Sequence, residues 1–274
     1  MNLRTLTLAT TSLVAIGLAV APASAKGMMG DLNLGYEHTW LEVGDGGQGF
    51  DESYPAIIGA GRVNLPYSDT VNIQLDVIGR ASMDKVFGDK SGHFALGGHI
   101  NHRDNQGLLG VFVGTGRVSD DFFFSETVFT AGIEGQYFCD QWSLLGQMGY
   151  MDSEGFTLLQ NAGFIQLGGN YYASKVLKIA ANLAYIDGEV FDTDVTQWGW
   201  SIGAHYWFGK SIPVSGFVEY RGRTVDAGSI DLDENAINFG LTFHFGGDGF
   251  QDADRNGASA NLPDFNWYRV VGND

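Results

Sequence analysis

One fragment of a ligand-binding motif lies near the C-terminus. Residues 252–257 read Asp-Ala-Asp-Arg-Asn-Gly, the first half of a calcium-binding loop, in which three oxygen ligands precede a glycine at a sharp turn. The glutamate that should close the loop is absent, because Pro263 stands at the twelfth position. We interpret Asp252, Asp254 and Asn256 as a candidate weak calcium site, with a solvated acidic turn as the alternative. No other cofactor is expected.

The histidines do not form a metal or catalytic pattern. If their segments are strands, His93, His99, His205 and His244 share the inward parity, and they lie on three segments, 92–103, 196–208 and 235–245. His99 and His102 are close in sequence, yet their side chains would face opposite ways. A nucleophilic serine needs a histidine base beside it, and the chain has no His-x-Ser arrangement. We therefore expect a protein that is not an enzyme.

Charged residues recur at alternate positions, with side-chain amides between them. Buried charges need water or a partner, because burying them bare is costly. The pattern allows two interpretations, a water-filled pore and an interior held shut by ion pairs. The residues predicted to line this interior are Glu37, Arg62, Asp76, Arg80, His99, Arg103, Glu134, Lys178, His205, Glu219, Arg221 and Arg223.

The segment Thr196–Phe208 shows which element positions these residues. Trp198, Trp200, Ile202 and every second residue after them form one apolar face, and the opposite face is mostly glycine and polar residues. Strict period-two alternation is typical of a β-strand with one apolar face. About 9 to 11 tilted residues cross a bilayer, and aromatic residues at both ends match the girdles of a membrane-spanning barrel strand. This face is predicted to contact lipid.

Eleven further segments repeat the pattern. The connections alternate between short turns and longer acidic loops such as 43–53 and 187–195, a pattern typical of barrels whose short turns lie in the periplasm. We therefore predict an all-β protein, a 12-stranded antiparallel up-and-down transmembrane β-barrel with short periplasmic turns and longer outer loops. Residues 107–118 are apolar on both faces, so their register is open. The predicted strands cover residues 31–41, 54–65, 71–82, 92–103, 107–118, 125–138, 142–151, 162–172, 176–186, 196–208, 214–223 and 235–245.

The N-terminal sequence predicts secretion, and the segment pattern predicts the domain boundaries. Arg4, the apolar run 6–20 and Ala23-Ser24-Ala25 predict a cleaved signal peptide over residues 1–25. The barrel is assigned to residues 26–246, and residues 247–274 are predicted to be a periplasmic tail. The single cysteine cannot form an internal disulfide. The net charge of −17 argues against nucleic-acid binding, which needs a basic surface.

The signal peptide, the amphipathic strands and the last strand Ile237–Phe245 together resemble the small porin-like outer-membrane proteins of Gram-negative bacteria. The resemblance covers roughly residues 30–246. It implies an outer-membrane location, with contacts to outer-membrane lipid, lipopolysaccharide and the barrel assembly machinery. One feature departs from the family, whose last strand commonly ends the chain. Here about 29 residues follow Phe245, so the assembly machinery would have to recognise an internal strand end.

These observations predict a channel for passive diffusion of small hydrophilic solutes. Twelve strands about 4.8 Å apart and tilted near 40° enclose a backbone radius of roughly 12 Å, which leaves room for a narrow pore. The acidic outer loops predict a mild preference for cations. The alternative is a structural or surface-interaction barrel with a plugged lumen, whose acidic loops bind divalent cations, lipopolysaccharide or a partner.

Overall fold

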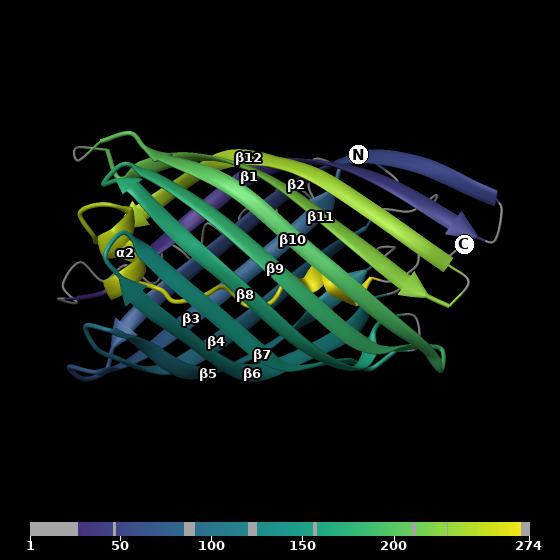
Figure 1. The fold of residues 1–274 in the computed structure, drawn as a ribbon, viewed down its shortest axis with the longest axis horizontal. Coiled ribbons are helices and arrows are strands. Elements are labelled where there is room, and N and C mark those ends of the chain that lie inside the picture. Colours follow the sequence, from purple (N-terminus) through teal and green to yellow (C-terminus); the bar gives the residue numbers. More distant parts are fainter. Residues whose placement is uncertain are drawn as a thin grey trace.

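The computed structural model describes residues 27–45, 48–84, 91–119, 125–155, 158–209, 212–228 and 230–269, and shows a closed antiparallel barrel of twelve strands (Figure 1). Each strand pairs with its neighbours in sequence, and β1 pairs with β12 to close the sheet. The predicted fold class is confirmed. The strands are β1 (Met29–Asp45), β2 (Gln48–Pro66), β3 (Val71–Ser82), β4 (Gly92–Arg103), β5 (Gly107–Ser119), β6 (Ser125–Cys139), β7 (Trp142–Ser153), β8 (Gln160–Ser174), β9 (Leu177–Val190), β10 (Thr193–Trp207), β11 (Val214–Ala227) and β12 (Ile230–Phe245).

Strand β10 shows the two faces clearly. The outward side chains of Trp198, Ile202 and Tyr206 are each at least half exposed, whereas the inward side chains of Val195 and Gln197 are fully buried. Large apolar residues are exposed at the outward positions of the other strands as well. Lipid contact accounts for this exposure, because a monomer in water rarely exposes so large an apolar surface. No described helix is long and apolar enough to cross a membrane.

Several strands run further than the sequence predicts, into segments expected to be acidic loops. Strands β1 and β2 stay in register to the pair Asp45 and Gln48, and β9 and β10 to the pair Val190 and Thr193. Phe191 and Asp192 form the turn between β9 and β10, with φ angles of 52° and 60°, as a two-residue hairpin requires. These acidic segments are therefore mostly strand, because backbone pairing continues through them.

The C-terminal segment differs from the expected tail outside the barrel. After β12, Gly246 and Gly247 adopt φ angles of 78° and 81°, a left-handed conformation that glycine adopts without strain. The chain then forms helix α2 (Phe250–Asn256) at one end of the barrel, runs through the lumen, and forms the 3₁₀ helix η1 (Phe265–Tyr268) inside it (Figure 1). We call residues 246–269 the plug. The barrel end beside α2 is the α2 end, and the opposite end is the hairpin end.

The lumen contains two kinds of surface. Polar and charged side chains surround the plug from the α2 end to the middle of the barrel. Towards the hairpin end, inward residues of nearly every strand form an apolar cluster around the tip of the plug. The wall residues of this cluster include Leu41, Val43, Val118, Val128, Met151, Phe164, Ile186, Val190, Val195, Val225 and Leu232, and those of the plug are Leu262, Phe265, Trp267 and Tyr268.

Candidate functional site

The structure places all twelve predicted lining residues at inward strand positions, where their side chains are buried or partly buried. It does not leave them around an open pore. Arg62 pairs with Asp31 at 2.5 Å, and Glu219 accepts a hydrogen bond from Asn238 at 3.3 Å. Most of the others contact one another or the plug, so their charges are compensated inside the lumen.

A cluster of ions lies where the polar and apolar parts of the lumen meet. The Glu37 carboxylate forms ion pairs with Arg80 Nε at 2.6 Å and with Arg221 Nη2 at 2.9 Å, and its side chain is almost fully buried. Arg223 pairs with Glu234 at 3.0 Å. Glu234 falls one residue before the predicted last strand, 235–245, but it lies on β12 with its side chain buried in the lumen.

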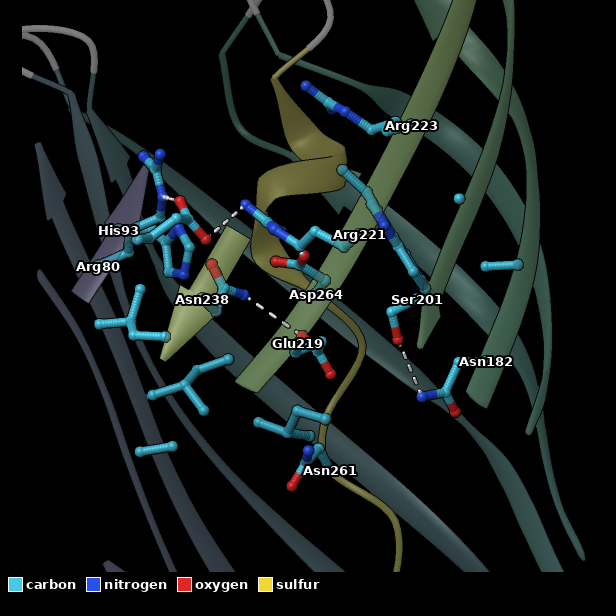
Figure 2. A pocket seen from close by; sticks show the side chains of 18 of the residues that line it. Arg80, His93, Asn182, Ser201, Glu219, Arg221, Arg223, Asn238, Asn261 and Asp264 are labelled. Carbon is cyan, nitrogen blue, oxygen red and sulfur yellow. Dashed lines mark hydrogen bonds and ion pairs between the residues drawn. The ribbon is translucent and has the colours of Figure 1, made fainter. Parts of the chain in front are cut away.

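The plug supplies the last carboxylate of this cluster. Asp264 accepts a hydrogen bond from Arg221 Nη1 at 2.6 Å, and Figure 2 shows the two side chains next to each other beside η1. Arg223 Nη1 also donates to the main-chain oxygens of Asn266 and Arg269, each at 2.7 Å. The cluster therefore joins strands β1, β3, β11 and β12 to the tip of the plug.

A second polar group holds the middle of the plug. His99 is fully buried between Asp76, 3.1 Å from Nε2, and Glu134, 2.9 Å from Nδ1. The Ser259 hydroxyl of the plug shares its hydrogen between Glu134 Oε1 at 3.0 Å and Gln74 Oε1 at 2.9 Å. The main-chain nitrogen of Ser259 also donates to Gln74 Oε1. Gln74 itself donates to Asp76 at 2.8 Å.

Wall side chains bind the plug mostly through its main chain. Gln147 donates to the oxygen of Asn261 at 2.9 Å, and Gln197 donates to that of Trp267 at 2.9 Å. Arg103 likewise donates to the oxygen of Arg255 at 2.8 Å. The inward amides therefore hydrogen-bond main-chain oxygens of the plug, which has no neighbouring strand in the lumen to bond them.

The candidate calcium motif does not form a calcium-binding loop. It lies in α2, where Asp252 accepts a hydrogen bond from Asn256 at 2.8 Å. Asp254 points another way and accepts from Tyr172 at 2.5 Å and Asn170 at 3.1 Å. The helix thus directs Asp254 away from the hydrogen-bonded pair of Asp252 and Asn256. Within the described ranges, no group of three or more histidine, cysteine or acidic side chains is arranged to hold a metal ion.

The structure has a serine–histidine contact that the sequence pattern does not reveal, because the two residues lie on different strands. Ser215 Oγ and His244 Nε2 lie 2.9 Å apart on β11 and β12. A nucleophilic serine also needs its base oriented by a third group. The ring of His244 instead stacks on Trp207, 4.1 Å between centroids, with Phe250 of α2 against its edge. This contact seats α2 in the end of the barrel.

Two polar cavities remain beside the plug. One has a volume of about 280 Å³ and borders the ion cluster (Figure 2). The other, of about 190 Å³, lies nearer α2. They share six lining residues, among them Asn33, Asn182 and Glu219, so they adjoin each other. Polar atoms such as Asn238 Oδ1 and His93 Nδ1 are buried there without a partner in the described part of the chain, as in hydrated cavities.

No family model and no curated protein sequence matches this chain. Solved structures with a similar fold include an outer-membrane channel, COG4313, from Pseudomonas putida F1. It has a TM-score of 0.54 and 12% identity, and the match covers 82% of this chain and 100% of that one. The KdgM porin has a TM-score of 0.49 and 8% identity, covering 77% and 99% of the two chains. The translocator domain of the autotransporter NalP from Neisseria meningitidis has a TM-score of 0.47 and 11% identity, covering 88% and 96%.

At these identities the likeness to the Pseudomonas channel concerns the fold. The chain has the fold of the porin-like outer-membrane β-barrels. The predicted signal peptide lies outside the described residues.

Proposed function

We propose that this protein is an outer-membrane channel for small hydrophilic solutes, and that its own plug closes it at rest. The proposal rests on one observation: the plug lies inside the barrel but is not one of the strands that form its wall. The twelve strands close on themselves without the plug, and the plug fills the lumen without joining the sheet. A segment that is not part of the wall can move while the barrel stays intact.

The polar half of the lumen supports the same proposal. The two adjoining cavities offer space for water beside the plug, and polar groups on several strands face them. The location in the outer membrane, the cleavage of the signal peptide, and the contacts with outer-membrane lipid, lipopolysaccharide and the assembly machinery belong to this proposal. The barrel fold and the resemblance support the location and these contacts, and the sequence pattern of residues 1–25 supports the cleavage.

A cross-link between plug and wall tests the gate in the full-length protein. The tip of the Gln74 side chain contacts Ser259, so a Gln74→Cys, Ser259→Cys pair in a Cys139→Ser background places a thiol on the wall near one on the plug. Thiol titration confirms the disulfide before currents are recorded, because its Cβ atoms must come within about 4.5 Å. We expect transient openings in planar bilayers when the pair is reduced, because the free plug can leave the lumen, and the loss of these openings on oxidation. The matched control is the Cys139→Ser protein under the same redox conditions. Equal currents from the locked and unlocked forms would contradict gating by the plug.

The mild cation preference is the finer part of the proposal. Asp226 and Asp231 lie directly opposite each other near the hairpin end, and Asp233 lies two residues further along β12. Their side chains are exposed and face outward, so their charges lie at some distance from the mouth of the channel. The cation preference that they cause should therefore be modest. It should also fade with salt, because the screening length is about 10 Å at 0.1 M and 3 Å at 1 M. Reversal potentials at both concentrations measure it, and anion preference at low salt would contradict it.

The ion-paired interior favours a second candidate, a structural barrel whose lumen stays closed. Glu37 binds two arginines from different strands, which ties the wall together. The acidic hairpins would then bind divalent cations, lipopolysaccharide or a partner. Well-folded protein that carries no current in the reduced form of the cross-link experiment would favour this candidate.

A further inference from the structure

We infer that the hairpin half of the lumen is a binding site for an amphipathic carboxylate, and that the plug tip, residues 264–268, occupies it as an internal ligand. The site would take a molecule with one carboxylate attached to an aromatic or aliphatic body. This inference deepens the proposed channel function, because the site lies in the lumen and its ligand must compete with the plug.

The first support is the charge balance of the ion cluster. The wall contributes three cations, Arg80, Arg221 and Arg223. The wall carboxylates that form ion pairs with them are Glu37 and Glu234, whereas Glu219 accepts a hydrogen bond from Asn238. The third carboxylate comes from the plug, since Asp264 takes the remaining Nη1 group of Arg221 at 2.6 Å. Without the plug, one buried guanidinium edge lacks its anion, and an arginine fork binds a carboxylate with well-defined geometry.

The second support is the apolar surface next to this arginine. Phe265 and Tyr268 are fully buried, and Trp267 nearly so, among inward aliphatic and aromatic wall residues. A lumen that only passed water and polar solutes would have no need for such a lining. The plug tip therefore presents a carboxylate followed directly by an apolar body, and the wall presents a cation followed directly by an apolar chamber.

The third support is the room beside the tip. The cavity of about 280 Å³ is lined by Arg221, Arg223 and Asp264 (Figure 2). Trp267 also lines it, so the cavity meets both the charged and the aromatic parts of the tip. Arg223 donates hydrogen bonds to the main-chain oxygens of Asn266 in the tip and of Arg269 directly after it. These donors would become available to a ligand once the tip moved. Polyols and cations match this site poorly, because neither compensates the arginine while filling an apolar chamber.

Binding of 3-phenylpropionate to the full-length protein tests the inference. Isothermal titration calorimetry in detergent, with empty micelles as the blank, would compare wild type with Asp264→Asn. Removing the competing carboxylate should tighten binding by about tenfold, which corresponds to about 1.4 kcal/mol. On the Asp264→Asn protein, 3-phenylpropan-1-ol lacks the carboxylate and acetate lacks the apolar body, so each should bind at least about tenfold more weakly.

Two arginine variants locate the site. Arg221→Gln should abolish saturable binding, whereas Arg117→Gln should leave it unchanged, because Arg117 is exposed on β5 near the same end. Equal binding of the acid and the alcohol to Asp264→Asn would overturn the inference, and so would unaltered binding to a folded Arg221→Gln protein. The comparison of probes does not depend on the folding of Arg221→Gln. Calorimetry reads binding alone, so a protein that binds the acid but carries no current would contradict the channel and leave the site standing.

Discussion

The two halves of the plug are held by different forces. Towards the α2 end, wall side chains bind its main chain and small polar groups, as Gln74 and Arg103 do. Towards the hairpin end, large aromatic side chains such as Phe265 pack in an apolar cluster, and Asp264 adds one ion pair. Phe250 of α2 also packs on Trp207, and Gln197 and Arg223 also bind main-chain oxygens of the tip. The two halves therefore differ in the balance of hydrogen bonds and apolar packing, with most of the apolar packing at the hairpin end.

This difference assigns separate roles to the two halves. A single hydrogen bond contributes only about 0.5–1.5 kcal/mol net, because water replaces it in the unfolded or displaced chain. Hydrogen bonds to main-chain atoms also depend little on the plug's own sequence. A buried aromatic side chain contributes more, about 3–5 kcal/mol on truncation to alanine. The hairpin half should therefore dominate the hold on the plug, and the α2 half should fix its path.

The largest effect is expected for Phe265→Ala. This side chain is fully buried in the apolar cluster, so its loss should lower the free energy of unfolding by about 3–5 kcal/mol. Urea titration in detergent, followed by the change of gel mobility without heating, measures the loss. Tyr67→Ala is the control, because Tyr67 lies exposed in the turn between β2 and β3. A loss below about 1 kcal/mol would reverse the ranking of the two halves.

The next effect is expected for Glu37→Gln, at the boundary between the halves. The substitution leaves Arg80 and Arg221 without their shared carboxylate, and hydrogen bonds to charged groups contribute about 1.5–3 kcal/mol. We expect a destabilisation in that range by the same titration. Glu42→Gln is the matched control, because Glu42 is exposed opposite Asp51 and Asp233, and removing a like charge there should be neutral or slightly stabilising. Equal effects of both variants would show that the cluster does not stabilise the barrel.

A smaller effect is expected for Ser259→Ala in the α2 half. The variant loses the Oγ hydrogen bonds to Gln74 and Glu134 but keeps the main-chain bonds of residue 259 to Gln74 and Arg62. The expected loss is about 0.5–1.5 kcal/mol, and Ser53→Ala on the exposed face of β2 is the control. A loss as large as that of Phe265→Ala would show that side-chain hydrogen bonds, rather than apolar packing, dominate.

The alternation of apolar and polar residues was enough to predict the barrel. In β10 it separates the lipid-facing Trp198 and Ile202 from inward residues, and the structure keeps that division. Charged residues such as Glu37 and Arg221 could be placed inside by parity alone. Their partners could not, because ion pairs such as that of Arg221 with Asp264 depend on how the lumen is filled.

The apolar half of the lumen had one signal in the sequence. Strand β5 is apolar on both faces, and the structure gives the reason. Val111 and Val113 face outward, whereas Leu108, Phe112 and Val118 are buried inside the barrel, and Phe112 and Val118 join the inner cluster. The plug had no such signal, because its contacts join residues far apart in the sequence, such as Arg221 and Asp264, 43 positions apart, or Arg62 and Ser259, 197 positions apart. Local periodicity carries no information about a segment that pairs with side chains of the wall rather than with a strand.

The smallest effect concerns a turn that belongs to neither half and so gives a baseline. Asp104, between β4 and β5, accepts hydrogen bonds from the main-chain nitrogens of Gln106 and Gly107 at 2.7 and 3.0 Å. These bonds lower the pKa of its carboxyl below the usual value. A depressed folded-state pKa means that the stabilisation is present above the unfolded value, about 3.9, and is lost as pH falls through the folded value. Wild type should therefore unfold at a slightly higher temperature than Asp104→Asn near pH 6, with the gap closing as pH falls below the unfolded-state pKa. Asp69→Asn, an exposed turn residue between β2 and β3, is the control, and a gap that stays constant with pH would rule out the carboxylate as its source.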